Sequence, residues 1–230
     1  MMQRPPSFIG FGALPRKTVY GDGTFPMRQD RIQLIDYRFW QPVSFSRHVH
    51  TIYGQQDGMC TANGGCGVML TERSFRGRPR VVLSPEHLYG QVARWGDGAS
   101  LDDVLQAMVK TGVCSRQLIP PDKWRPSDWP PGWEAEAKQN RMLEWIDLDG
   151  FDAVASALQQ YRPCLVGVRW PGGGGHAICA TELWQDGDTW GIGGPNSWGS
   201  KWNIDGFYRL TERECDDFRQ YGAWAAGSST

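Results

Sequence analysis

The sequence has no long apolar run and no excess of charge of one sign. Its 230 residues carry 24 Lys and Arg against 25 Asp and Glu, a formal net charge of −1 with a pI near 6.4. A chain balanced in this way has no basic field that would concentrate nucleic acid or an anionic membrane surface. The apolar residues around 164–170 fall far short of the roughly 20 that cross a bilayer. We therefore expect a partner that is neither nucleic acid nor a membrane.

The sequence also lacks a secretory signal and a dense cysteine framework. Residues 1–14 hold Pro, Gly and one Arg, without the apolar centre of about 7 to 15 residues that a signal peptide has. This predicts that the chain stays in the compartment where it is made. Six Cys are spread along the chain with no CxxC pair, so we interpret them mostly as buried free thiols. A bridge between Cys residues distant in sequence remains open.

The periodicity of apolar residues predicts an α+β protein. Residues 1–34 show no sustained pattern and are expected to form an extended N-terminal arm, which leaves residues 35–230 as a single domain. Helical spacing predicts one helix after the N-cap Ser84, one from Ser100 to Gly112, and one over residues 151–161. Short runs rich in Val, Ile and aromatic residues predict strands at residues 35–38, 165–170, 176–184, 189–193 and 207–210. Helices followed by antiparallel strands are typical of the α+β class.

A proline- and tryptophan-rich stretch lies between these two parts of the chain. Residues 120–133 contain five Pro and three Trp, which favours an irregular loop held down by its aromatic side chains. We expect this loop to separate a left lobe, about residues 50–130, from a right lobe, about residues 131–230.

Cys60 is the first candidate for chemistry. It follows a polar, glycine-containing loop that leads into a predicted helix. A thiol at a helix N-terminus has its thiolate stabilised by the helix dipole and by free backbone N–H groups, so it can act as a nucleophile. A small buried core residue is the commoner fate of a free Cys and remains the alternative.

Two further residues complete a possible nucleophile, base and orienting group. His176 begins an apolar strand after four consecutive glycines, where a substrate could reach it. Asn196 follows 20 residues later; its side-chain oxygen can accept an imidazole N–H and fix the ring, while Trp198 keeps water from that bond. The alternative for His176 is a structural histidine, and the alternative for the segment at Asn196 is an ordinary turn. The order Cys, His, Asn along one chain favours the catalytic interpretation.

Other motifs are weaker. The pair His48 and His50 could suggest a metal ion, but no carboxylate or Cys cluster stands near it in the sequence. The four glycines at residues 172–175 are not followed by the Lys and Ser or Thr of a phosphate-binding loop. We expect neither a metal nor an organic cofactor.

The chain resembles the papain-like cysteine peptidases. The spacing of 116 residues from Cys60 to His176 and 136 to Asn196 lies close to the roughly 130 to 150 expected for that family. The resemblance covers most of the chain, and its most specific part is Asn-Ser-Trp-Gly at residues 196–199. The other matching motifs are Ile-Asp-Tyr-Arg at residues 35–38, Leu-Ser-Pro-Glu at 83–86, Gly-Val-Cys at 112–114, Gly-His-Ala at 175–177 and Gly-Phe-Tyr at 206–208. Cys-Thr-Ala-Asn at residues 60–63 resembles compact bacterial and phage members.

The resemblance implies a two-lobed fold, with a helical left lobe and an antiparallel right lobe, and a peptidase that acts on peptides or proteins. It implies catalysis by Cys60, His176 and Asn196, with Trp198 in support. It also implies an oxyanion hole and a substrate groove, whose candidates here are Gln55 and Gln56 for the hole and Gly96, Asp97, Gly98 and Gly175 for the groove. The expected location is cytoplasmic or virion-associated.

The sequence departs from the family in ways that keep other functions open. The Gln of the oxyanion hole is expected six residues before the nucleophile, where this chain has Gly54, and Gly64, Gly65 and Gly67 fall inside the expected nucleophile helix. Fewer than 40 residues precede Asp36, so inhibition by a long cleaved propeptide is not expected. One alternative is a binding or structural component of a larger assembly such as a phage particle, with weak or no turnover. Another is thiol chemistry on the amide bonds of cell-wall peptides.

Overall fold

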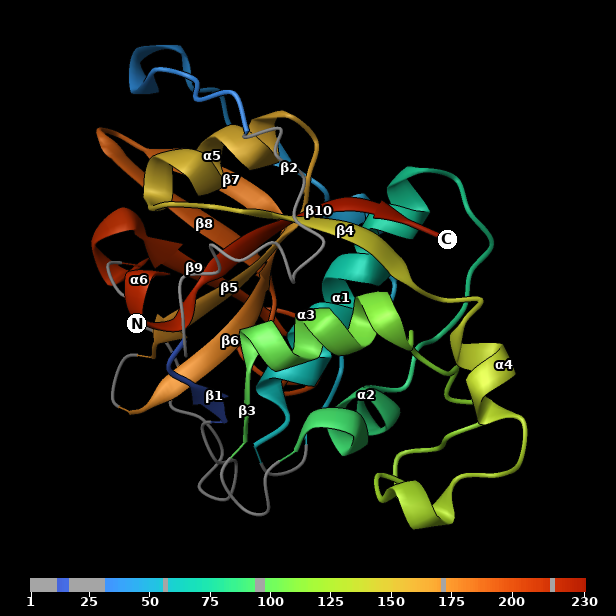
Figure 1. Ribbon diagram of the computed structural model, residues 1–230. Coiled ribbons are helices and arrows are strands. Elements are labelled where there is room, and N and C mark those ends of the chain that lie inside the picture. The colour runs from blue at the N-terminus through green and yellow to red at the C-terminus, as the bar shows by residue number, and fades with distance from the viewer. Residues whose placement is uncertain (1–11, 17–31, 56–57, 94–97, 171–172, 216–217) are drawn as a thin grey trace.

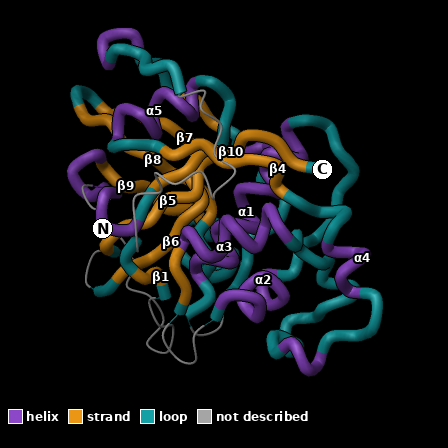
Figure 2. The backbone as a smooth tube through the Cα atoms, in the orientation of Figure 1, coloured by secondary structure: helices purple, strands orange, loops and turns teal. Residues whose placement is uncertain are grey.

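The protein places its main helices on one side of two antiparallel sheets (Figures 1 and 2). This computed structural model describes residues 12–16, 32–55, 58–93, 98–170, 173–215 and 218–230. Three helices, α1 (Cys60–Phe75), α2 (Pro85–Val92) and α3 (Leu101–Lys110), pack against one another. No helix in these described segments is long and apolar enough to cross a membrane.

Helices α2 and α3 begin where the sequence predicts. The hydroxyl of Ser84 accepts the backbone N–H of His87 at 3.2 Å, and that of Ser100 accepts the N–H of Asp103 at 3.2 Å. Each serine therefore satisfies one of the donors that the first turn of a helix leaves unpaired. These caps define where α2 and α3 begin.

The strands form two four-stranded antiparallel sheets. The first has the order β4 (Met142–Asp147), β10 (Ala223–Ser229), β5 (Cys164–Arg169) and β6 (Gly175–Ala180). The second has the order β2 (Val43–Ser44), β7 (Glu182–Asp186), β8 (Thr189–Pro195) and β9 (Phe207–Thr211). The other elements of the described residues are the paired parallel strands β1 (Ala13–Leu14) and β3 (Ala99–Ser100), 3₁₀ turns at Tyr37–Phe39, Ser46–His48, Pro126–Asp128 and Glu212–Cys215, and helices α4 (Trp133–Ala137), α5 (Phe151–Gln159) and α6 (Phe218–Tyr221).

The first sheet lies between two apolar cores. Side chains alternate between its faces along each strand, so Leu165 and Cys179 join the core that contains α1, α2 and α3. Their neighbours Val166 and Ile178 join the core under α5 and the second sheet. Buried apolar residues on both faces make this sheet the layer that holds the helical part and the second sheet together.

Glycines let α1 approach this sheet closely. A Cβ atom on Gly64 would lie 2.7 Å from Leu165 Cδ1, and one on Gly67 would lie 3.3 Å from the Cβ of Cys179. The expected cost of glycine inside a helix is about 1 kcal/mol relative to alanine. Close packing of the helix on β5 and β6 accounts for the glycines at these two positions.

Three sequence predictions about elements were wrong. Residues 35–38 do not form a strand, because Asp36 accepts the backbone N–H of Arg38 at 3.0 Å and starts a 3₁₀ turn. Residues 176–184 form two strands, since the chain passes at Thr181 from one sheet to the other. The third helix ends at Gln159 rather than Tyr161, whose backbone has φ of 59°.

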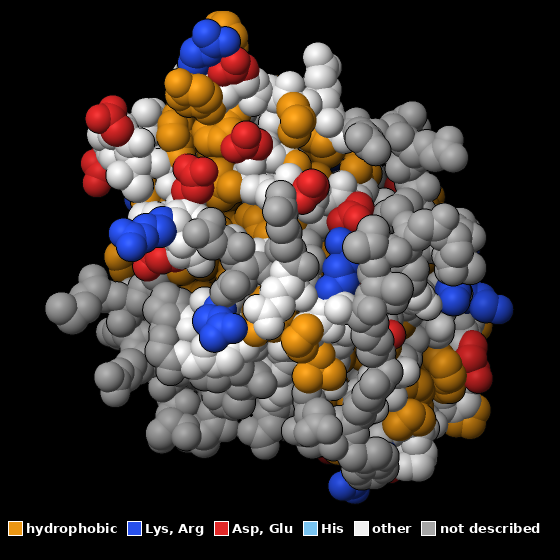
Figure 3. Space-filling model, turned by 60° about the vertical axis from the view of Figure 1, so that its left-hand side comes forward, with side chains coloured by type: hydrophobic (Ala, Val, Ile, Leu, Met, Phe, Trp, Pro, Cys, Tyr) orange, Lys and Arg blue, Asp and Glu red, His pale blue; other side chains and the backbone are white. Residues whose placement is uncertain are grey.

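The surface carries charges of both signs. On the face shown in Figure 3, Lys and Arg side chains are interspersed with Asp and Glu among the described residues. This distribution agrees with the balanced composition. The lobe limits near residue 130 and the extent of the N-terminal arm stay predictions.

Candidate active site

Cys60 is the first residue of α1. Its N-cap, Met59, makes no side-chain hydrogen bond to the first turn, and the backbone N–H groups of Cys60 and Thr61 lie at the thiol. Burial raises the pKa of the Cys60 thiol, while the backbone N–H groups of Ala177, Gly12 and Thr61 act in the opposite direction. The side chain is fully buried, and Gly12 is one of the residues that cover it.

His176 lies on β6 and is held by Asn196, which directly follows β8. The ring Nε2 and Asn196 Oδ1 are 2.8 Å apart. The ring of Trp198 stacks on the imidazole with centroids 4.9 Å apart, and Trp170 meets its edge at 5.1 Å. Burial lowers the pKa of His176 to about 4, with the bond to Asn196 acting in the opposite direction. Two indole rings therefore pack against the imidazole that makes this contact.

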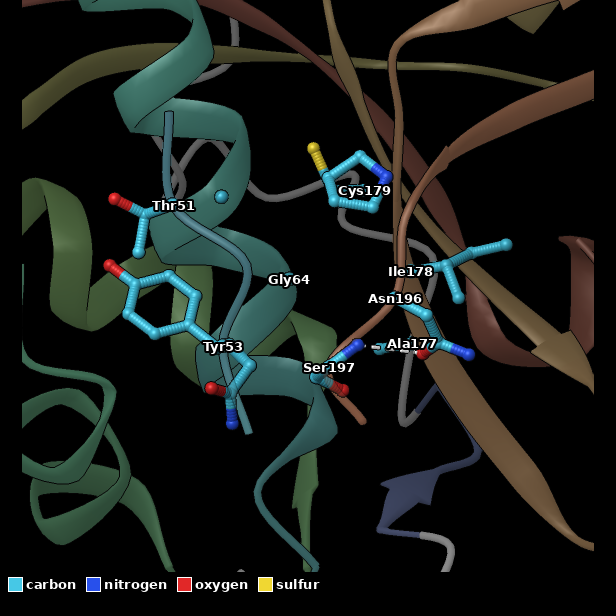
Figure 4. Close-up of a pocket in the computed structure, with 11 residues that line it drawn as sticks. Thr51, Tyr53, Gly64, Ala177, Ile178, Cys179, Asn196 and Ser197 are labelled. Carbon is cyan, nitrogen blue, oxygen red and sulfur yellow. Dashed lines mark hydrogen bonds between the residues drawn. The ribbon is translucent and has the colours of Figure 1, made fainter. Parts of the chain in front are cut away.

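The packing of α1 on β6 brings these residues to one place. The thiol of Cys60 meets the backbone N–H of Ala177, the residue that follows His176. Figure 4 shows Asn196 and Ser197 on the far side of a small pocket from Tyr53, with Gly64 of α1 between them. The contact with Asn196 uses Nε2 of the His176 ring and does not involve Nδ1.

Gln55 is fixed by the same loop. Its backbone N–H donates to Ser197 O at 2.6 Å, and its side-chain oxygen accepts the Ser197 hydroxyl. The side chain is buried, with 7% exposed. Gln56, the other candidate for the oxyanion hole, lies outside the described residues.

Two of the predicted groove glycines face each other across a segment of the chain itself. A Cβ atom on Gly98 would lie 2.1 Å from Gly12 O, and one on Gly175 would lie 2.3 Å from Ala13 O. Ala99 donates its backbone N–H to Gly12 O at 2.9 Å. Residues 12 and 13 of the chain therefore lie against two of the glycines predicted to line a substrate groove. Gly96 and Asp97 lie outside the described residues.

The remaining histidines have other surroundings. His48 Nδ1 and His50 Nε2 lie 3.3 and 2.9 Å from the hydroxyl of Ser74, and Arg80 lies against His50. Among the described residues, no three His, Cys, Asp or Glu side chains gather into a group that could hold a metal ion. All six Cys are free and buried.

Sequence reasoning missed two parts of this site. The role of Ser197 in holding Gln55 could have been suspected, because Ser197 lies within the Asn-Ser-Trp-Gly motif. The position of residues 12–16 could not have been predicted, because the sequence of a short glycine-containing segment without periodicity does not indicate where the segment packs.

The group assembled here can perform acyl-transfer chemistry. A thiol at a helix N-terminus, an imidazole, an amide that orients the imidazole and a buried Gln amide are the parts that nucleophilic attack on a carbonyl requires. None of them needs a metal or an organic cofactor for that chemistry.

Comparisons with known proteins show similarity at the level of structure. Neither a protein-family model nor a curated protein matches the sequence. Xylellain, a cysteine protease from Xylella fastidiosa, matches with a TM-score of 0.74 at 19% identity, covering 99% of each chain. ProCathepsin B S9 from Trypanosoma congolense matches with a TM-score of 0.72 at 15% identity, over 96% of this chain and 87% of that one. Digestive procathepsin L 3 of Tenebrio molitor matches with a TM-score of 0.69 at 16% identity, over 88% and 76%. The chain therefore has the α+β fold of the papain-like cysteine proteases.

Proposed function

We propose that the protein is a cysteine peptidase that hydrolyses peptide bonds with Cys60, His176 and Asn196. The observation that carries the proposal is the buried 2.8 Å contact between His176 Nε2 and Asn196 Oδ1. The residue after His176 on the same strand, Ala177, directs its backbone N–H to the thiol of Cys60. The likeness to solved cysteine proteases over nearly the whole chain supports it.

The proposed reaction uses only groups of this chain. His176 takes the proton of Cys60, and the thiolate attacks the substrate carbonyl. The amide of Gln55 and the backbone N–H of Cys60 stabilise the oxyanion. His176 then gives its proton to the leaving amine, and water hydrolyses the thioester. Asn196 acts as a positioning residue that keeps the imidazole in one orientation.

The protonation states of this pair depend on access to water. Burial raises the pKa of Cys60 and lowers that of His176, so both directions favour the neutral thiol and neutral imidazole in the covered site. Hydration of the groove when residues 12–14 are displaced reverses both effects. The ion pair required for attack would then form at the open site.

The substrate and setting follow from the same proposal. Peptides or proteins are the expected substrates, because the groove pairs with an extended backbone at Ala99. We further propose a compact bacterial or phage-like member of the family, cytoplasmic or virion-associated.

A second candidate function is a binding or structural component of a larger assembly with little or no turnover. The complete burial of the Cys60 and His176 side chains favours it, since a nucleophile must be reached by its substrate. The two candidates differ in whether the thiol reacts.

Labelling of the thiol distinguishes them. The full chain is treated at pH 6 with iodoacetamide or an epoxide probe, and modified Cys residues are mapped in the wild type, in His176→Ala and in the matched control His50→Ala, which alters an exposed histidine. Selective labelling of Cys60 that is lost in His176→Ala and kept in His50→Ala supports the peptidase. Slow labelling spread over several Cys residues and equal in all three proteins would contradict it.

A further inference from the structure

Residues 12–16 lie in the groove as a peptide ligand would. Strand β1 (Ala13–Leu14) pairs in parallel with β3 (Ala99–Ser100) and also contacts β6. At one end of this segment, the N–H of Gly12 meets the thiol of Cys60. At the other end, the N–H of Arg16 donates to Gln220 O at 2.8 Å. The segment is thus bound through its main chain, as in recognition by strand addition.

The side chain of Arg16 ends in a site built for a guanidinium group. Its two terminal nitrogens lie 3.3 and 2.8 Å from the two carboxylate oxygens of Asp147. Its Nε lies 3.9 Å from Asp102, and the group stacks over the ring of Trp224 at 4.7 Å. Three elements, α3, β4 and β10, supply these three contacts.

The burial of this site separates it from an ordinary surface ion pair. Only 14% of the Arg16 side chain, 1% of that of Asp102 and 29% of that of Asp147 are exposed. A carboxylate as far from water as that of Asp102 is costly unless a cation accompanies it, and a planar fork that also stacks on an indole fits better than an ammonium group. By contrast, the pair Arg38–Asp36 has 67% and 39% of its side chains exposed, and such pairs contribute little.

We propose that Asp102, Asp147 and Trp224 form an arginine-binding subsite of the groove, which Arg16 fills in cis and an arginine of a bound peptide fills in trans. The identification of the groove as a substrate site rests on the proposed function. Four residue-to-residue steps of about 3.3 Å each separate Gly12 at the thiol from Arg16 in the subsite, so the segment spans about 13 Å of extended chain. Residues 12–16 therefore act as a tethered ligand that competes with peptides at high effective concentration.

Binding tests the subsite without any need for turnover. In a full-length Cys60→Ala background, binding of the peptide acetyl-Gly-Ala-Leu-Pro-Arg-amide is measured by calorimetry with Arg16 intact, with Arg16→Ala and with the control Arg38→Ala. The Arg16→Ala protein should bind the peptide about 10- to 100-fold more tightly than the other two, because its subsite is empty.

Chemical specificity is tested with the same peptide carrying citrulline in place of arginine. Citrulline keeps the size and removes the charge, so its affinity for the Arg16→Ala protein should be about 10- to 100-fold lower. Adding Asp147→Asn should remove this preference, whereas Asp188→Asn on the exposed turn after β7 should keep it. Equal affinity for arginine and citrulline, or equal effects of the two Asp substitutions, would overturn the proposal.

A second readout keeps the proposal testable if these variants fold poorly. With Cys60 intact, iodoacetamide labelling of the thiol should be faster in Arg16→Ala than in the wild type, and Arg16→Lys should lie between them. Labelling rates that are equal in all three would overturn the tethered-ligand proposal. A protein that binds the arginine peptide but hydrolyses nothing would refute the peptidase and leave the subsite in place.

Discussion

Among the single residues of the site, Ser197 holds the side chain of Gln55 in one orientation. Because the Gln55 oxygen accepts the Ser197 hydroxyl and its main-chain N–H donates to Ser197 O, the amide is held from two points. The side-chain oxygen of Gln55 already accepts the Ser197 hydroxyl. The side-chain NH₂ group of Gln55 is a donor of the kind that an oxyanion requires. Gln55 can therefore serve the oxyanion hole one position later than the family pattern places it.

Substitution of Gln55 tests this role. Gln55→Ala should lower kcat about 10²- to 10³-fold with a smaller change in KM, since an oxyanion donor acts in the transition state. The measurement is steady-state hydrolysis of a peptide reporter. Gln185→Ala, on the exposed part of β7, is the matched control and should leave both constants near those of the wild type. Unchanged kcat in Gln55→Ala would assign the role to another donor.

Among the secondary-structure elements, helix α1 determines the position of Cys60, the proposed nucleophile. The helix lies against β6 along residues 64–67, and this contact sets how close Cys60 comes to the strand that carries His176. A side chain at Gly64 would meet Leu165 first and the backbone of Ala177 and Ile178 next. The glycines that the sequence places inside the helix thus control the geometry of the site.

A bulky side chain at Gly64 should disturb both stability and chemistry. Gly64→Val forces Leu165 and β6 away from α1, and overpacking of this kind costs typically about 1 to 3 kcal/mol of unfolding free energy. Urea unfolding measures that cost, and the rate of Cys60 labelling measures the displacement of the thiol from His176. Gly67→Ala meets Cys179 at 3.3 Å and should cost less. The prediction is wrong if Gly64→Val unfolds at the wild-type urea concentration.

Two buried histidines make the stability of the whole molecule depend on pH. Burial lowers the pKa of both His87 and His176 to about 4. His87 lies between Trp129 and Trp133, with ring centroids 4.4 and 5.1 Å away, and its Nδ1 accepts the N–H of Cys114. The loop at residues 120–133 thus packs through its aromatic residues, as the sequence predicts, and it covers a neutral imidazole.

The sign of the pH effect follows from these lowered values. Between about pH 6.5 and 4 the unfolded chain binds protons at these histidines and the folded protein does not, so the free energy of unfolding falls as the pH falls. Each histidine contributes a slope of roughly 1.4 kcal/mol per pH unit within that window. Above about pH 7 this contribution to stability is complete.

Urea unfolding at a series of pH values measures the slope. His87→Gln keeps an acceptor side chain and removes the titrating ring, so the slope between pH 6.5 and 4 should be shallower than in the wild type by about one proton. A variant whose slope equals that of the wild type would show that His87 titrates alike in the folded and unfolded states.

Much of the fold and of the candidate site could be predicted from local sequence. Ser84 and Ser100 start helices because a hydroxyl cap acts within four residues, and the strands between residues 164 and 211 follow from short apolar runs bounded by turns. Cys60, His176, Asn196 and Trp198 were chosen by residue type and order, and the structure brings all four together.

Other features depended on contacts between distant segments. Strands β4 and β10 were not predicted, because β10 consists mostly of Ala, Gly and Ser, without the β-branched residues that indicate a strand, and it is defined by its pairing with β4 and β5. The placement of residues 12–16 over Cys60 and of Arg16 between Asp102 and Asp147 joins parts of the chain separated by up to 131 residues. By itself the sequence determined which side chains are able to react and which segments coil or extend, since those properties arise from each residue and its near neighbours. Only the tertiary structure decided that the reactive thiol is covered and by what, because burial is a property of the whole packed molecule.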